Sequence, residues 1–444
     1  MSLCNTGSEL LLRHHEMAAD PSVLNLCYSF GLDGPLDIEA FRWALRALVE
    51  VYPELGCIPE DDSALLIHQE IAGDECERLP GLIELERRKP FDLAAGLLVR
   101  ARIFRLSPVQ HMLILCFHHS GADGWSLGLY ARYLTRAYQA ATDGTPLDNT
   151  RAPETGALRS EGRRARDEAS LRTVLEGIDS RAVDPFGAQT VQSSNLLSWN
   201  VPLDADFVFA VQSTAKRLRT TAFGLVVTAT ANWLHQRFST DRIVIGTTVL
   251  GRRSVGELAA GGARYQGALL PLQESDRTAS RVAIAIAAMT DRALFYEEQL
   301  GILSSAMGIN GVLEPAVFVL ADCHPMSTLN LKNVKISMVT VPEPATCMAR
   351  PAHSLSCGRI ALFWRGGEGG GALTTFCEPA LLDEARLLHS GVLQDVSESV
   401  GAVPRLEEPI IWGQSLIKRS PPPADTLSPV AVPGTHFFNR NSIG

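Results

Sequence analysis

The chain has 444 residues, which is more than one hydrophobic core usually supports, so two domains are expected. Apolar residues make up 46% and charged residues 20%, as in an ordinary globular protein. The net charge of −9 argues against a general nucleic-acid binder, because such proteins neutralise phosphates with Lys and Arg.

The nine cysteines are scattered, odd in number and free of any Cys-x-x-Cys pair. This pattern favours reduced, mostly buried thiols over a disulfide framework or a zinc site. The start of the chain has no basic region followed by an apolar one, and no apolar stretch is long enough to span a bilayer. We therefore expect a cytoplasmic protein with neither a membrane nor a nucleic acid as partner.

Hydrophobic periodicity predicts the elements of the first half. In chain order they are a strand at 23–32, a helix at 38–51, strands at 64–71, 97–106 and 112–117, and a helix that ends at 141. In helix 38–51, the residues Phe41, Ala44, Leu45 and Leu48 share one face. Strand 112–117 is apolar throughout, which indicates a central strand covered on both faces. His14 and His15 precede these elements, and a helix face is favoured for them because no further ligand follows at metal spacing.

The second half repeats this mixture of strands and helices, so the fold class is α/β. Its predicted helices are 207–218, 222–238, 280–300 and 380–397, and its predicted strands are 241–248, 316–320, 334–341, 360–365 and 372–377. The glycine-rich run 366–371 is expected to be a hairpin loop between two strands. We place the domain boundary in the charged connecting segment before residue 179. The predicted division is 1–178, 179–400 and a proline-rich extended tail, 401–444.

The most informative stretch is Phe-His-His-Ser-Gly-Ala-Asp-Gly-Trp-Ser at 117–126. A histidine in a cleft can take a proton near neutral pH. Neighbouring residues on an extended turn point in opposite directions, so His118 and His119 should divide into one structural and one catalytic residue. Asp123 could fix the loop by pairing with an arginine or by accepting backbone N–H bonds.

Three other interpretations of this stretch remain open. A metal site would need a third ligand, which the spacing does not supply. Gly124 to Gly128 matches the Gly-x-Ser-x-Gly elbow of serine hydrolases, but eight residues separate Ser126 from the end of its strand, so Ser126 is expected to be a helix N-cap. The stretch could also be a purely structural turn.

Residues 118–126 resemble the HHxxxDGWS signature of nonribosomal peptide synthetase condensation domains. The wider superfamily is the chloramphenicol acetyltransferase-like acyltransferases, which include polyketide-associated acyltransferases. Segments 44–55, 90–93, 98–101 and 244–252 resemble further parts of the family, in the right order. The resemblance implies two similar acyltransferase-like domains, of α+β sandwich type, in a V-shaped pseudo-dimer with a central tunnel.

The resemblance also implies site residues. His119 would be the general base, with His118 and Asp123 structural and the backbone N–H of Gly124 as oxyanion donor. Further substrate-binding residues would be Trp125, Ser126, Tyr265 and Gln266. No metal or bound cofactor is implied.

The implied function is an acyltransferase of natural-product biosynthesis, free-standing and monomeric. Its co-substrate would be the thioester of a phosphopantetheinyl acyl or peptidyl carrier protein or of coenzyme A, and its acceptor a small-molecule amine or alcohol. The alternative is a catalytically inactive docking domain that recruits a carrier or tailoring protein.

Two departures from the family pattern affect the site. Many condensation domains carry an arginine in the segment that corresponds to 51–57, where it pairs with the motif's Asp. Val51 and Gly56 occupy those places here. Asp123 is therefore expected to pair with Arg42, Arg46 or Arg252, or with no arginine. The family's Asn after the second-half strand is also missing from segment 265–271.

Overall fold

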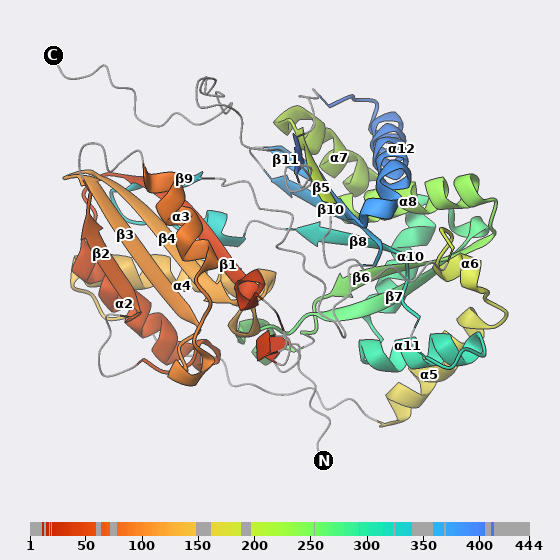
Figure 1. Cartoon of the computed structure of the whole chain (residues 1–444), viewed down its shortest axis with the longest axis horizontal. Helices are drawn as coiled ribbons and strands as arrows, with labels where there is room; N and C mark the ends of the chain where they lie inside the picture. Colours follow the sequence, from red (N-terminus) through yellow and green to blue (C-terminus); the bar gives the residue numbers. More distant parts are fainter. Residues whose placement is uncertain are drawn as a thin grey trace, which may run out of the picture.

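The protein is described here from a computed structural model. The structure describes residues 11–12, 15–16, 18, 20–58, 64–71, 78–147, 161–187, 197–252, 254–292, 294–311, 313–322, 325–339, 358–367, 370–404 and 410–412. Two β-sheets form the centres of two lobes, which lie side by side in Figure 1. The predicted fold class, two α/β halves, is confirmed.

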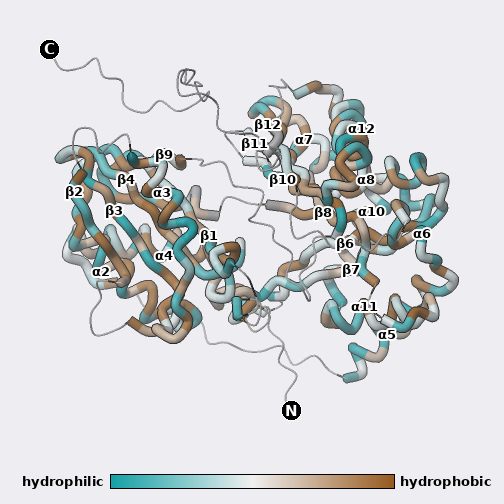
Figure 2. Tube along the Cα trace, viewed as in Figure 1, coloured by the Kyte–Doolittle hydropathy of each residue, from teal (hydrophilic) through white to brown (hydrophobic). Residues whose placement is uncertain are grey.

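The first sheet has the order β2-β3-β4-β1-β9. Its strands are β1 (Asn25–Asp33), β2 (Leu66–Glu70), β3 (Val99–Ser107), β4 (Gln110–His118) and β9 (Lys335–Val339). β4 lies in the middle, antiparallel to both β1 and β3. Figure 2 colours the trace of each strand by residue hydropathy. The side chains of β4 alternate between two core clusters, with Leu113 and Leu115 in one and Met112 and Ile114 in the other. This confirms the predicted central strand covered on both faces.

Helices cover both faces of the first sheet. The cluster that contains Leu115 also holds α2 (Ile38–Val51) and α4 (Gly124–Asp143). The four side chains predicted to share one face of α2 are all fully buried. The opposite face packs against α3 (Leu79–Arg88), a helix that the sequence prediction missed.

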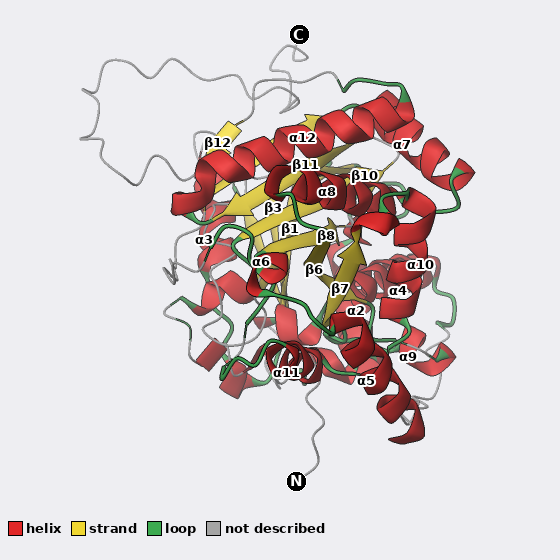
Figure 3. Cartoon of the chain, turned by 90° about the vertical axis from the view of Figure 1, so that its right-hand side faces the viewer, coloured by secondary structure: helices red, strands yellow, loops and turns green. Residues whose placement is uncertain are grey.

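The second sheet has the order β12-β5-β11-β10-β8-β6-β7. The strands are β5 (Leu197–Leu203), β6 (Arg242–Val249), β7 (Gln266–Gln273), β8 (Val317–Asp322), β10 (Ile360–Gly367), β11 (Gly370–Cys377) and β12 (Ile410–Trp412). The helices over one face are α7 (Ala205–Arg217), α8 (Ala222–Phe238), α10 (Ala279–Thr290) and α12 (Leu382–Val400). Those over the other face are α5 (Glu161–Leu175), α6 (Ser180–Val183) and α11 (Tyr296–Ala306). Figure 3 shows α8 and α12 lying across this sheet.

The structure corrects several predicted elements. The single helix expected at 280–300 is two helices, because the chain turns between Thr290 and Tyr296 and buries Leu294. Strand β9 lies in the first sheet, paired with β1, although its sequence belongs to the second half. Strands β5 and β7 were not predicted. The glycine-rich run does connect two antiparallel strands, β10 and β11.

The lobes, as defined by core packing, also divide the chain at other positions than the predicted boundaries after residues 178 and 400. Leu171 and Leu175 of α5 share a core cluster with Leu269 and Phe318, so α5 belongs by packing to the second lobe rather than to the first. The expected tail includes a strand, β12, which pairs with β5. Residues 413–444 lie outside the described part of the chain.

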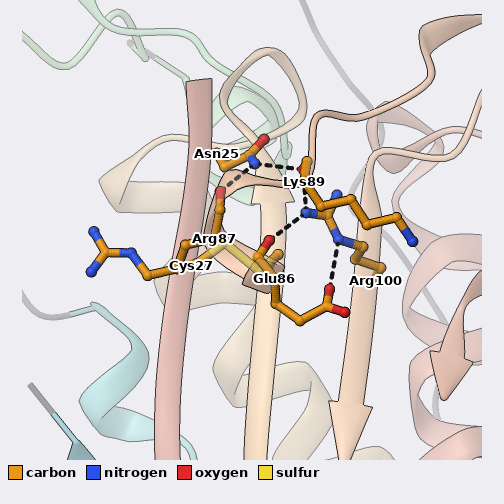
Figure 4. Close-up of a disulfide and its surroundings, with 7 residues drawn as sticks. Asn25, Cys27, Glu86, Arg87, Lys89 and Arg100 are labelled. Atoms are coloured by element: carbon orange, nitrogen blue, oxygen red, sulfur yellow. Dashed lines mark hydrogen bonds and ion pairs between the residues drawn. A yellow bond between two sulfur atoms is a disulfide. The ribbon is translucent and has the colours of Figure 1, made fainter. Parts of the chain in front are cut away.

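The prediction of reduced thiols is wrong for Cys27 and Cys116, which form a disulfide (Figure 4). The two residues are 89 apart in sequence but lie directly opposite each other in β1 and β4, which brings their side chains together. Beside them, Asn25 and Arg100 hold the end of α3 through bonds to the Lys89 carbonyl. Cys57 and Cys377 are free. No helix in the described ranges has the length and apolar character needed to span a membrane.

Candidate active site

The motif begins where β4 ends. His119, Ser120 and Gly121 form one 3-10 turn, and α4 starts at Gly124. Asp123 is the N-cap of α4, and its carboxylate accepts the backbone N–H of Ser126 at 2.9 Å. Ser126 in turn accepts the backbone N–H of Asp123 at 2.7 Å. The two residues form a capping box. The prediction that Ser126 is the N-cap is therefore wrong: Asp123 is the N-cap, and Ser126 is the third residue of the helix.

Because it belongs to the capping box, the Ser126 hydroxyl is not available as a nucleophile. The side chain is fully buried, and its hydroxyl also contacts the Asp123 carboxylate at 2.8 Å and the Gly262 carbonyl at 3.2 Å. A nucleophilic serine must reach its substrate, which this hydroxyl cannot do. The structure therefore contradicts the nucleophile-elbow interpretation, and we assign no substrate contact to Ser126.

His119 is half-buried, and its ring has a defined tautomer. Its Nδ1 lies 2.8 Å from the carbonyl oxygen of Ala122, an atom that can only accept. Nδ1 must therefore carry the proton and donate it, which leaves the lone pair on Nε2. Nε2 has no hydrogen-bond partner within the described part of the chain. This is the protonation state that a histidine needs to act as a base through Nε2.

His118 is fully buried, and its ring contacts His15, Ser120 and Phe91. Its Nδ1 accepts the backbone N–H of Ser120 at 3.2 Å, and its Nε2 lies 3.1 Å from Nδ1 of His15. Burial lowers the pKa of His118 to about 3, with further lowering by His15, His119 and Arg100. The ring is therefore neutral at physiological pH, and its contacts are those of a structural residue.

Asp123 pairs with Arg252, one of the three arginines proposed from the sequence. The Arg252 guanidinium donates to the carboxylate at 2.6 Å and to the Gly262 carbonyl at 2.9 Å. The backbone N–H of Arg264 donates to the same carboxylate oxygen at 2.9 Å. Burial would raise the pKa of Asp123, but the bonds and charge of Arg252, with the amides of Ser126 and Arg264, hold the pKa below its ordinary value.

A segment that begins shortly after Arg252 packs over the motif from the second lobe. We call residues 254–265 the clamp loop; it contains the short helix α9 (Val255–Ala259). Trp125 donates through Nε1 to the Leu258 carbonyl at 2.7 Å, and Ala263 donates its N–H to the Ser120 carbonyl at 3.3 Å. These bonds join sequence positions that are far apart and lie in different lobes.

Tyr130 of α4 connects the two loops directly. Its hydroxyl donates to the Gly121 carbonyl at 2.8 Å and accepts the N–H of Gly262 at 3.0 Å. The side chain is fully buried, and the ring leaves no room for a Cβ at Gly261, which would come within 2.3 Å of the hydroxyl. Burial raises the pKa of Tyr130 well above its usual range, so the hydroxyl keeps its proton.

Tyr130→Phe should therefore cost about 1–3 kcal/mol in the free energy of unfolding, because two buried backbone groups lose their partner. It should also lower the rate of acyl transfer, since the clamp loop is no longer bonded to the motif. Tyr138→Phe is the matched control: it removes a hydroxyl that accepts the Asp37 N–H outside the site, and should reduce stability alone. Urea denaturation and turnover of both variants test this, and wild-type stability of Tyr130→Phe would contradict it.

Two of the predicted substrate-binding residues, Tyr265 and Gln266, lie near His119, whereas Trp125 and Ser126 bond to the protein itself. Tyr265 lies beside His119, with ring centroids 5.4 Å apart, and Gln266 follows it as the first residue of β7. Trp125 is 40% exposed and its indole N–H is used by the clamp loop. Tyr265 is thus the predicted substrate-binding residue that the structure brings next to the predicted base.

Sequence reasoning missed three participants: His15, Tyr130 and the backbone of the clamp loop. The pair His14-His15 stands out in the sequence, but nothing in the sequence relates His15 to His118, which is 103 positions away. Tyr130 lies on the buried face of a long helix, where an aromatic residue usually fills the core. His14 lies outside the described residues.

Comparison with known proteins agrees with this geometry. The family profile described as "Condensation domain" matches residues 9–263. The chain is 30% identical over 257 residues to phosphinothricin tripeptide synthetase PhsC of Streptomyces viridochromogenes, covering 52% of this chain and 24% of the relative. It is 27% identical over 257 residues to malpibaldin synthetase of Mortierella alpina, covering 52% of this chain and 4% of the relative. The chain thus spans less than a quarter of the length of these two relatives.

Solved structures agree in fold at lower identity. The condensation domain of the monacolin K polyketide synthase MokA superposes with a TM-score of 0.68 at 15% identity, covering 90% of this chain and 98% of that one. The first condensation domain of the CDA synthetase gives a TM-score of 0.64 at 17% identity, covering 90% and 97%. The X-domain of teicoplanin biosynthesis, solved in complex with OxyB, gives 0.61 at 18%, covering 91% and 96%. With its profile match over more than half of the sequence, this chain belongs to the condensation-domain family, and it shares the fold of these structures over about 90% of its length.

Proposed function

We propose that this chain transfers an acyl group from a thioester to an amine or hydroxyl acceptor, forming an amide or an ester in natural-product biosynthesis. The thioester would be carried by a phosphopantetheinyl carrier protein or by coenzyme A. The observation that carries the proposal is the tautomer of His119, whose Nδ1–H is bound by the Ala122 carbonyl and whose Nε2 is basic.

In the proposed reaction, the acceptor nitrogen or oxygen attacks the thioester carbonyl while Nε2 of His119 takes its proton. The tetrahedral intermediate then collapses, the C–S bond breaks, and the departing thiolate receives the proton from His119. The net change is thioester plus acceptor to amide or ester plus thiol. The backbone N–H of Gly124, the first residue of the 20-residue helix α4, is the proposed donor to the intermediate's oxyanion. No step needs a metal or an acyl-enzyme.

The remaining residues would orient the two substrates. Tyr265 and Gln266 are proposed to line the substrate path next to His119, where the two lobes meet. Asp123 and Arg252 would keep the loop in one conformation without touching the substrate. Positioning of two reactants against a fixed base supplies a large part of the rate enhancement in reactions of this kind.

The test is transfer measured by intact mass. The full chain is incubated with a panel of acyl- and aminoacyl-loaded carrier proteins and coenzyme A thioesters, each with a set of amines and alcohols. We expect one donor class to lose its acyl mass while an acceptor gains the same mass and one thiol is released per transfer. Binding of a carrier protein without loss of acyl mass from any donor would contradict acyl transfer and favour the docking alternative.

A further inference from the structure

The first described residues of the chain lie between the two lobes (Figure 1), where His15 contacts His118 of the motif. Residues 11–12 and 15–16 are helical, and we call them the N-terminal segment. Leu11 is 1% exposed and packs in a cluster with Leu24 and Ala263, with Tyr265 against it. Leu11 thus contacts Ala263 of the clamp loop, and His15 contacts His118 of the motif.

The contact between His15 and His118 is directional. Since the Ser120 N–H and hydroxyl both approach Nδ1 of His118, at 3.2 and 2.6 Å, Nδ1 is the acceptor nitrogen of that ring. The proton of the neutral ring is then on Nε2, which faces Nδ1 of His15 at 3.1 Å. The His118 pKa of about 3 keeps this ring neutral and able to donate through Nε2 alone. His15 is therefore the acceptor for the last polar atom of a fully buried ring.

The same bonds define the position of His119. His118 and Ser120 are its two neighbours in the chain, and Ser120 is also bound by Ala263 of the clamp loop. Phe91 packs edge-on against the His118 ring, with centroids 5.8 Å apart, so the ring is enclosed on that side as well. Loss of the acceptor at His15 would leave a buried N–H unpaired and free the His118 ring to change its orientation.

We propose that His15 is a positioning residue for acyl transfer: its Nδ1 accepts the Nε2–H of His118 and thereby fixes the turn that presents His119. The role in catalysis rests on the function proposed above for His119. His15 itself does not contact the reacting atoms. The N-terminal segment is then a part of the active site, added to it from outside the two sheets.

Three variants of the full chain separate the hydrogen bond from packing. His15→Phe keeps a ring of similar size and removes the acceptor. His15→Asn places Oδ1 where Nδ1 stood and keeps the acceptor. His68→Ala, at an exposed histidine of β2, is the control. We expect His15→Phe to lower kcat by roughly 10–100-fold with KM changed less than about threefold, because a small misplacement of a catalytic group costs about this much. His15→Asn should recover most of the rate.

A second readout does not depend on turnover. In protein labelled with ¹⁵N-histidine, the Nε2–H of His118 should give the downfield shift of a hydrogen-bonded proton in the wild type and in His15→Asn, and should lose that shift in His15→Phe. Wild-type turnover by His15→Phe, or an unchanged Nε2–H shift of His118 in that variant, would overturn the proposal. Equal loss of rate in His15→Phe and His15→Asn would also overturn it. If the wild type transferred no acyl group, the proposed function would fail while the Nε2–H measurement still tested the contact.

Discussion

Replacing His119 with alanine should lower kcat/KM for acyl transfer by roughly 10²–10⁴, the usual contribution of a general base. The ring donates from Nδ1 to the Ala122 carbonyl and presents Nε2 as the basic nitrogen, so alanine removes the proton acceptor. Residual activity should remain, since the substrates are still held together and the oxyanion donor is still present. The measurement is initial rate against substrate concentration for the donor and acceptor identified by the panel.

The fold of this variant should remain intact. His119 is half-buried, and its ring donates a hydrogen bond to the Ala122 carbonyl, close to the start of α4. We therefore expect thermal unfolding within a few degrees of wild type, as for His68→Ala. A stable His119→Ala protein with wild-type kcat/KM would show that the base has been assigned to the wrong residue.

Arg252→Ala should have the largest effect on stability, about 3–5 kcal/mol in the free energy of unfolding. The Arg252 side chain is fully buried and bonds the carboxylate of Asp123, which is 3% exposed. Removing one partner of a buried ion pair leaves the other charge without compensation, and such losses are among the largest that single substitutions cause. The same change removes the guanidinium bond to the Gly262 carbonyl, which contributes to the contact between the lobes. Urea denaturation followed by tryptophan fluorescence measures the difference.

The double variant Asp123→Asn with Arg252→Ala is the control. If the two side chains act as a pair, it should lose clearly less than the sum of the single losses, because the unpaired charge has also been removed. Additive losses would contradict the assignment of Arg252 as the partner of Asp123.

The acid side of the stability curve provides a second check on the pair. The pKa of Asp123 is lower in the fold than in the unfolded chain, so the carboxylate stabilises the protein fully above the unfolded value of about 4. This stabilisation is lost as the pH falls through the folded-state pKa. Asp123→Asn should therefore flatten the dependence of stability on pH below about pH 4.

The sequence was sufficient for features that depend on local pattern. Helices α2 and α8 begin and end where periodicity and capping residues predict, and β4 is buried on both faces as its uniform apolar run indicates. The motif with His118 and His119 lies at the end of β4, as expected from the order of strand, polar turn and helix.

Features that depend on distant contacts could not be predicted in the same way. The choice of Arg252 over Arg42 and Arg46 depends on how the lobes meet, since Asp123 and Arg252 are 129 positions apart. The disulfide depends on the register of β1 and β4, and β9 joins the first sheet by pairing with β1, a strand some 300 positions earlier. At Ser126, by contrast, a local pattern is misleading. The Gly-x-Ser-x-Gly match at 124–128 suggests a nucleophile, but the hydroxyl is buried in the capping box.

In the proposed mechanism, His119 takes the acceptor's proton during direct transfer from thioester to acceptor. The decisive experiment is single-turnover transfer, with enzyme in excess over one loaded donor and with quenched samples analysed by intact mass. We expect acyl mass to pass from donor to acceptor while the enzyme's own mass stays unchanged, and His119→Ala to slow this single step by roughly 10²–10⁴. An acylated enzyme that forms and decays at the rate of transfer, or a His119→Ala step as fast as wild type, would contradict it.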